Sequence, residues 1–185
     1  MNRGKRLPWR VALLGAAALL AGACDEPTNT PVASPDLMAM QADQVMYDMV
    51  SYLTASGVRQ GRVQADTAYV YTDSSKIVIR GLQLVFYNED GRARATVTAR
   101  EGEINQTTDA MVARGNVVLV VHEDGRKIES PELHYDPDRD KIWSDSTTVQ
   151  TEKDGTVTRG SAFESDLEFR NVRISNIRGG GNIIF

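Results

Sequence analysis

The residues best suited to acid-base or metal chemistry are few, and they are not arranged as a catalytic site. Only His122 and His134 are able to act as bases near neutral pH or as soft metal ligands. Both fall in segments that alternate like strands, which favours structural or exposed roles. Three carboxylates lie close together in Asp136-Pro137-Asp138-Arg139-Asp140, but the run lacks the glycine and terminal glutamate of an EF-hand calcium loop. A turn between two strands is the better interpretation.

Nucleophile and phosphate-binding motifs are also missing from the sequence. Ser74-Ser75 and the run from Ser144 to Thr148 match no nucleophile elbow or catalytic triad. The glycines from Gly179 to Gly181 precede no helix that would bind a phosphate. We therefore predict that the protein is not an enzyme and that it uses no cofactor and no metal.

The chemistry of Cys24, the only cysteine, is indicated by what precedes it. Four basic residues among the first ten come before the apolar run from Val11 to Leu20, and Ala21-Gly22-Ala23-Cys24 follows. This order is that of a bacterial export signal, and a cysteine after small residues resembles the lipobox of bacterial lipoproteins. We predict that residues 1–23 are a lipoprotein signal peptide and that Cys24 is the lipidation site, held in the membrane by its acyl chains.

Two alternatives for this segment stay open. About 13 uncharged residues lie between Arg10 and Cys24, against about 20 for a helix that crosses a bilayer, which makes an uncleaved anchor the weaker alternative. Cys24 is otherwise an incidental residue near a general signal-peptidase site, since Ala21 stands where the lipobox usually has leucine.

Removal of the signal leaves 162 residues, enough for one domain with its own core. In this mature chain 17 Lys and Arg stand against 25 Asp and Glu. An acidic domain without a basic cluster is a poor candidate for binding nucleic acid, because such binding depends on neutralising phosphates. We expect a flexible, proline-spaced tether over residues 24–36, a folded domain over 37–178 and a flexible tail over 179–185.

The segment from Leu37 to Leu53 is ambiguous between helix and strand. The spacing of one helical face is followed by Met38, Ala42, Val45, Met46, Met49 and Leu53. As a strand, Met46, Val50 and Tyr52 would spoil the alternation. We therefore predict a short helix that ends near Gly57.

Beyond Gly57 the sequence repeats with a period of 34 residues. Arg80-Gly81, followed by a Glu-Asp-Gly-Arg turn, recurs as Arg114-Gly115 with a second Glu-Asp-Gly-Arg turn. A degenerate third copy runs from Leu133 to Gly155. Each unit alternates with a period of two and ends in an Asp-Gly dipeptide, which is typical of β-hairpins. Apolar residues change parity across Gly81, which predicts a bulge or bend there and at Gly115.

These features carry a resemblance to a known family. The runs VMYDMVSYLTASGVRQGRVQADTAYVY, Gly-Asn-Val-Val at 115–118 and Glu-Leu-His-Tyr-Asp at 132–136 resemble the LptC family, the periplasmic component of the lipopolysaccharide export ABC transporter, and the wider OstA-like group. The resemblance implies an all-β fold, a twisted antiparallel β-jellyroll of OstA-like repeats. It also implies a passive lipid conduit.

A conduit of this kind would hold acyl chains between two facing sheets and leave sugars and phosphates in water. The candidate groove residues are Val63, Ala65, Leu82, Leu84, Phe86, Val97, Ile104, Val118, Val120, Leu133, Ile142, Phe163, Leu167 and Phe169. From the residues alone, a closed sandwich core is an equal alternative.

The resemblance further implies partners and a location. They are lipopolysaccharide, the subunits of an inner-membrane ABC transporter, and a periplasmic OstA-like bridge protein bound by edge-strand pairing. Asp25 after Cys24 matches the rule by which enterobacteria retain lipoproteins in the inner membrane, so we expect the domain at the periplasmic face of that membrane. The anchor departs from the family pattern, which uses a transmembrane helix. The competing hypothesis is a scaffolding envelope lipoprotein with a closed β core and no lipid cargo.

Overall fold

The computed structural model describes residues 42–55, 57–178 and 180–182. The predicted signal peptide, Cys24 and the tether lie outside this range. The described chain forms one antiparallel sheet of twelve strands and no helix, hence no helix able to cross a membrane. The strands are β1 (Gln44–Ala55), β2 (Val58–Tyr71), β3 (Lys76–Tyr87), β4 (Ala93–Asn105), β5 (Met111–Val121), β6 (Lys127–Asp136), β7 (Lys141–Ser144), β8 (Thr148–Thr151), β9 (Thr156–Gly160), β10 (Ala162–Ser165), β11 (Arg173–Ser175) and β12 (Gly180–Asn182).

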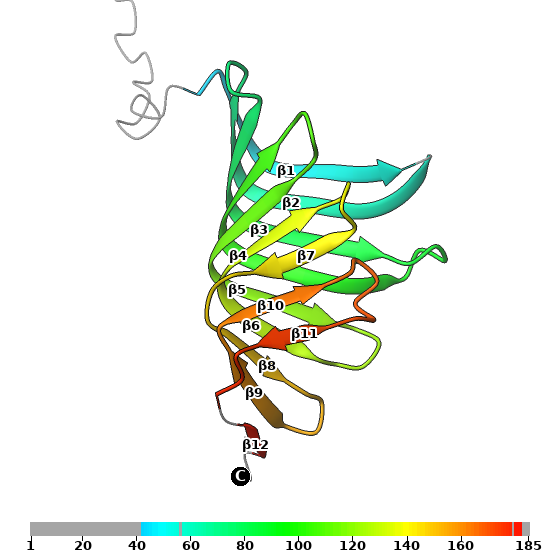
Figure 1. Ribbon diagram of the computed structural model, residues 1–185. Helices are drawn as coiled ribbons and strands as arrows, with labels where there is room; N and C mark the ends of the chain where they lie inside the picture. The colour runs from blue at the N-terminus through cyan, green and yellow to red at the C-terminus, as the bar shows by residue number, and fades with distance from the viewer. Residues whose placement is uncertain (1–41, 56, 179, 183–185) are drawn as a thin grey trace, which may run out of the picture.

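The sheet runs in chain order from β1 to β6 and then divides. The end of β6 pairs with β7, and β10 and β11 follow. The start of β6 pairs instead with β8, and β9 and β12 follow. We call these two halves the β7 arm and the β8 arm; the long strands β2 to β6 contribute one end to each arm. Figure 1 shows the long strands turning along the left side of the view, with both arms extending to the right.

A bend across β2 to β6 separates the two arms. In a flat strand the inward side chains are two residues apart, but here the step is larger at one place in each strand. The inward residues pass from Ala65 to Ala68 on β2, from Ile79 to Leu82 on β3 and from Ser130 to Leu133 on β6. On β5 they pass from Ala113 to Val117. The same face of the sheet therefore points inward on both sides of the bend.

The repeated Arg-Gly pairs lie on this bend. Gly81 and Gly115 have φ angles of +67° and +79°, in the left-handed region that side chains with a Cβ avoid. Their arginines lie on the convex side in a row of cross-strand neighbours of alternating charge, Arg80, Glu101, Arg114 and Glu132. Arg80 is ion-paired with Glu101, and Arg114 Nε lies 3.7 Å from Glu132 Oε2. The predicted bend at both glycines is confirmed.

The predicted helix at 37–53 is wrong over its described part, because Gln44–Ala55 forms the edge strand β1. β1 bends where its neighbours do. Asp48 has a φ of +50°, and the inward residues step from Met46, opposite Ala68, to Met49, opposite Ala65. With Leu53 four residues further on, this bend reproduces the three- and four-residue spacing of a helix. Gly57, predicted to stop a helix, has a φ of +78° between β1 and β2.

The two arms meet at the C-terminal end of the sheet. Ser161 N donates to Ser175 O at 3.0 Å, and Arg178 N donates to Arg159 O at 2.8 Å. A Cβ on Gly160 would lie 2.3 Å from Ile174 Cγ2, so glycine permits this approach. Residues 180–182, expected in a flexible tail, instead pair with β9 as β12.

Replacement of Gly115 tests the bend. Gly115→Ala is expected to lower the free energy of unfolding by about 1–2 kcal/mol, because alanine is strained at positive φ. Gly115→Asn is expected to cost less, since asparagine tolerates this region better. Urea denaturation measures both values. Equal stability of Gly115→Ala and the wild type would show that the bend does not depend on this backbone conformation.

Candidate functional site: an apolar interior between the arms

The inward faces of the two arms form one continuous apolar interior. Its cluster includes Val63, Leu84, Phe86, Val97 and Leu119 from the β8 arm and Ile79, Met111, Leu133, Ile142 and Phe163 from the β7 arm. These side chains are between 0 and 4% exposed. The branched and aromatic residues fit the pleated inner surface of the sheet. The buried polar residues of the described chain are Ser130, Ser144, Thr148 and Ser165, none of which is charged.

The structure brings together twelve of the fourteen predicted groove residues. Val63, Ala65, Leu82, Leu84, Phe86, Val97, Ile104, Leu133, Ile142, Phe163 and Phe169 belong to the interior cluster, and Leu167 packs against it. The family resemblance implied that these residues line one common groove, and the structure places them in one interior. Contact with lipid stays a prediction.

Val118 and Val120 are wrongly placed by the sequence prediction. The 34-residue period aligns them with Leu84 and Phe86, but both are half-buried on the opposite face of β5. Asn116 beside Gly115 also has a positive φ, +51°, and the pairing of β5 with β6 slips between Arg114 and Val117. This bulge adds a residue that β3 does not have.

The inward residues of β5 are therefore Val117, Leu119 and Val121, which the sequence prediction missed. Leu84 lies opposite Val97, and Val97 lies opposite Leu119, so one inward row crosses β3, β4 and β5. The alternation of buried and half-buried residues after Asn116 identifies these three residues as inward, once the bulge is known. Ile79, Met111, Tyr135 and Ile128 were also missed.

Three aromatic rings bridge the arms. Phe86 on the β8 arm lies 5.4 Å from Tyr135 on the β7 arm, and 5.9 Å from Phe169, measured between ring centroids. Both distances are within the range of favourable aromatic pairs. Burial raises the pKa of Tyr135 to about 12, so its hydroxyl is neutral at physiological pH.

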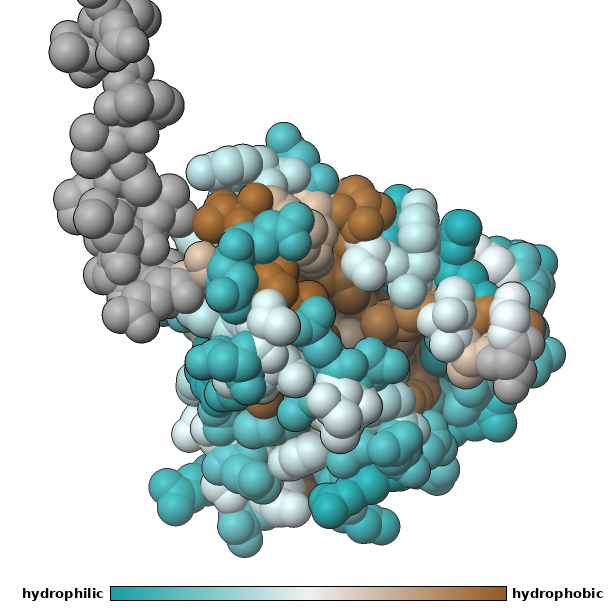
Figure 2. All heavy atoms as spheres, turned by 90° about the horizontal axis from the view of Figure 1, so that it is seen from above, coloured by the Kyte–Doolittle hydropathy of each residue, from teal (hydrophilic) through white to brown (hydrophobic). Residues whose placement is uncertain are grey.

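The interior is accessible to solvent at its β1 end. Met46 and Leu53 on β1, and Ile77 on β3, are only partly buried against the cluster. Figure 2 looks onto this end and shows apolar residues at the surface of a hollow with polar residues around it. The opposite end is closed where β9 approaches β11. The interior is therefore open at one end of the sheet.

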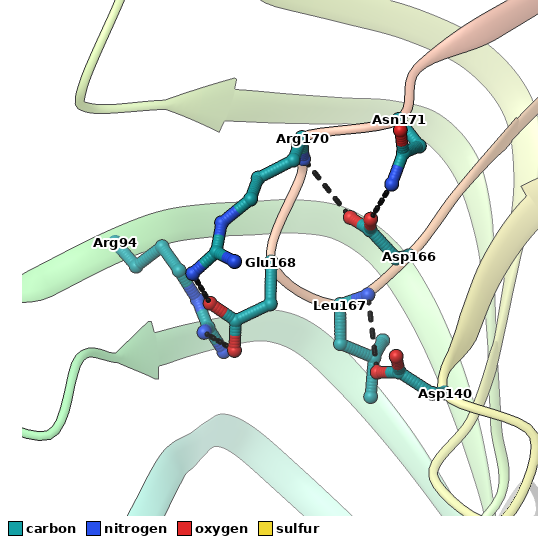
Figure 3. A network of polar contacts seen from close by, with 7 residues as sticks. All are labelled: Arg94, Asp140, Asp166, Leu167, Glu168, Arg170 and Asn171. Carbon is teal, nitrogen blue, oxygen red and sulfur yellow. Dashed lines mark hydrogen bonds and ion pairs between the residues drawn. The ribbon is translucent and has the colours of Figure 1, made fainter.

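The loop between β10 and β11, residues 166–172, crosses from the β7 arm to the β8 arm, and we call it the strap. Glu168 Oε1 accepts a hydrogen bond from Arg94 Nη1 of β4 at 2.7 Å, and Leu167 N donates to Asp140 Oδ1 at 3.4 Å. Figure 3 shows Arg94 approaching Glu168 from the strand behind the strap. The strap thus contacts both arms.

Asp166 holds the strap in shape. Its carboxylate accepts hydrogen bonds from Arg170 N at 2.9 Å and from Asn171 Nδ2 at 2.6 Å (Figure 3). Burial alone would raise the pKa of Asp166, but the hydrogen bonds from Asn171 and Arg170 outweigh it and lower the pKa. The carboxylate is therefore charged at neutral pH.

The two histidines and the run from Asp136 to Asp140 make structural contacts. His122 Nε2 lies 2.9 Å from Thr96 Oγ1, and His134 stacks on Trp143 with ring centroids 5.0 Å apart. The Asp136 to Asp140 run is the predicted turn, with Arg139 N donating to Asp136 Oδ1 at 3.2 Å. No group of His, Cys, Asp or Glu in the described residues has the arrangement of a metal site.

A charged pocket beside the strap is lined by side chains that form ion pairs with one another. Glu164 lies 2.8 Å from Lys141 Nζ and 3.0 Å from Arg173 Nη1. The hydrogen bond from Lys141 and its charge lower the pKa of Glu164. Because both cations already have this carboxylate as a partner, the pocket is a weaker candidate than the apolar interior.

The bent sheet and its apolar interior define a class of protein, the open β-jellyroll. A solved structure with this fold is that of LptH from Pseudomonas aeruginosa, described as the LptA-homologous periplasmic component of the conserved lipopolysaccharide transport device. It matches with a TM-score of 0.50 and 14% identity over 63% of this chain and 82% of that chain. The all-β jellyroll prediction is confirmed.

The sequence gives the particular family. The model of the family described as lipopolysaccharide-assembly, LptC-related matches residues 11–180, and the chain therefore belongs to the LptC family. No curated protein sequence matches the chain. Family membership assigns the chain to lipopolysaccharide transport, as a periplasmic transport component and not an enzyme.

Neighbouring residues of β5 test which face is inward. Leu119→Ala is expected to cost about 2–5 kcal/mol of unfolding free energy, because Leu119 is fully buried and its truncation leaves a cavity. Val118→Ala is expected to cost less than about 1 kcal/mol, since its half-buried side chain lies on the outer face. Chemical denaturation gives both values. Equal costs, or a larger cost at Val118, would contradict this register.

Proposed function

We propose that the protein is a membrane-anchored component of lipopolysaccharide export. It accepts the lipid from an inner-membrane ABC transporter and passes it along the apolar interior to a periplasmic bridge protein. The observation that carries the proposal is the apolar interior shared by the two arms and open at the β1 end. The acyl chains of lipopolysaccharide are long and apolar, and burying them in this interior is favourable by roughly 25 cal/mol of free energy for each Å² of apolar surface removed from water.

The open side of the bent sheet suits an amphipathic cargo. Acyl chains would lie between Leu84 and Leu119 on one arm and Leu133 and Ile142 on the other. Sugars and phosphates would stay in water beyond the rims. A passive conduit needs no acid-base group at its lining, and none of the buried polar residues in the described part of the chain is charged.

Edge strands supply the proposed contacts with neighbouring transport proteins. Among the described strands, β1, β11 and β12 each pair with one neighbouring strand, and no second described strand pairs with their other side. A free edge presents unpaired backbone N–H and C=O groups that another sheet can continue. We propose that the transporter and the bridge protein use edges at opposite ends of the sheet, so that the apolar surfaces become continuous.

The proposed anchor is an acylated Cys24. The short, proline-containing stretch after it keeps the domain close to the membrane, because extended chain spans about 3.1 Å per residue. Asp25 supports retention at the inner membrane, where the transporter lies. Acylation would thus replace the transmembrane helix of other family members.

The second candidate is a scaffolding lipoprotein whose core stays closed. It is favoured by the complete burial of Val63, Leu119 and Ile142, each 0% exposed. In that case these residues stabilise the fold and meet no cargo. Crosslinking in living cells separates the two functions.

A photo-crosslinking amino acid at Leu84 or Leu119 is expected to form an adduct with lipopolysaccharide in cells. The same residue at Val118 or Thr98, on the outer face of the paired strands β4 and β5, is the matched control and is expected to give at least tenfold less adduct. Immunoblots against the protein and the lipid detect the adducts. No adduct at either inner position, with the protein folded and abundant, would reject the conduit in favour of the closed scaffold.

Metabolic labelling with radioactive palmitate tests the anchor. The wild-type protein is expected to incorporate label, and Cys24→Ala is expected to lose it, because attachment of the lipid begins at the thiol of Cys24. As a control, Ser34→Cys in the Cys24→Ala background returns a cysteine outside the lipobox and is expected to stay unlabelled. An unlabelled wild-type protein would rule out lipidation at Cys24.

A further inference from the structure

The strap crosses from one arm to the other and places an aromatic side chain in the interior between them. Phe169 is 2% exposed and belongs to the interior cluster, although the loop that carries it lies at the rim. Its ring contacts Phe86, which in turn contacts Tyr135 on the opposite arm. Leu167 packs against the same cluster. A chain of apolar contacts therefore spans the space between the arms beneath the strap.

The backbone of the strap is strained at this residue. Phe169 has a φ of +58°, a left-handed conformation that is rare for bulky side chains and costs of order 1–3 kcal/mol. Phe169 N donates to Asp166 O at 3.1 Å, and the Asp166 carboxylate holds Arg170 N and Asn171 Nδ2. The local hydrogen bonds thus keep the strap in a shape that drives the ring inward.

Contacts of the strap with the two arms are unequal. On the β7 arm it is covalently continuous with β10 and β11, and Leu167 N donates to Asp140. On the β8 arm, the strap makes the ion pair between Glu168 and Arg94. Arg94 is largely buried, with 11% of its side chain exposed, whereas Glu168 is 44% exposed. Loss of this pair and of the ring contact between Phe169 and Phe86 would release the strap from the β8 arm and leave it attached to the β7 arm.

We propose that the strap is a movable closure of the lipid-binding interior, held shut by the Arg94–Glu168 ion pair and by the ring of Phe169. This inference rests on the proposed function. In the closed state the ring of Phe169 occupies space between the arms, and acyl chains that enter from the side must displace it. The strap moves with the β7 arm and separates from Phe86 and Arg94 on the β8 arm.

Substitutions that weaken the closure test this proposal in the full-length protein. Glu168→Gln removes the charge of the pair, and Phe169→Ala removes the ring. Both are expected to accelerate uptake of fluorescently labelled lipopolysaccharide at least threefold in stopped-flow measurements. Asp145→Asn, a change at an exposed carboxylate away from the strap, is the control and is expected to leave the rate unchanged. Glu168→Gln keeps the experiment decisive if Phe169→Ala fails to fold.

Crosslinking the strap to the β8 arm in a double-cysteine variant is expected to slow lipid loading, the opposite of the effect of weakening the closure. Arg94→Cys together with Glu168→Cys is expected to load lipid faster than the wild type before treatment. After reaction with a short bismaleimide it is expected to load at least tenfold more slowly. The control pair, Lys141→Cys with Glu164→Cys, joins β7 to β10 within the β7 arm and is expected to load at the wild-type rate when linked.

The readout at Leu84 separates failure of the strap from failure of the conduit. Equal loading of the two linked proteins, with lipid still crosslinking at Leu84, would overturn the strap proposal and leave the conduit intact. Unchanged uptake in Glu168→Gln and Phe169→Ala would overturn it as well. Absence of any adduct at Leu84, in the wild type and in every variant, would overturn the conduit itself.

Discussion

The shared bend across the long strands is the constraint on which the rest of the structure depends. Without it, a sheet this wide would expose one apolar face to water, at a cost proportional to its area. With it, the inward face of β2 to β6 turns back on itself, and residues such as Ile79 and Leu84 of one strand line opposite arms. Glycines at positive φ make the turn possible, and the charged row on the convex side keeps that surface in water.

The sequence predicted the parts of the fold that depend on local chemistry. The repeated Arg-Gly pairs marked the bend, and the Asp-Gly dipeptides marked turns, with Gly91, Gly125 and Gly155 all at positive φ. Alternation then placed most interior residues on the correct face, as Leu84 and Val97 show. The sequence predicts these features correctly because the backbone conformation of a few adjacent residues determines each of them.

The errors came from the bend itself, which is not local to one strand. On β1 the step from Met46 to Met49 imitates a helix, and only pairing with Ala68 and Ala65 of β2 explains it. On β5 the added residue at Asn116 moves Leu119 inward where the 34-residue period places Val118. The spacing of apolar residues predicts the inward face only where a strand is uninterrupted. A bend shared by neighbouring strands shifts the inward face without changing the amino-acid composition of the strand.

The energy of the strap is consistent with a closure that opens readily. Burying the ring of Phe169 contributes about 2–3 kcal/mol, and the pair between Arg94 and Glu168 adds roughly 1 kcal/mol. The left-handed backbone at Phe169 offsets about 1–3 kcal/mol of this. The sum favours the closed state by about 0–3 kcal/mol, and its midpoint of about 1.5 kcal/mol corresponds to an open population of roughly 7 per cent. A lipid whose acyl chains replace the ring against Phe86 would need only a small part of its binding energy to shift that equilibrium.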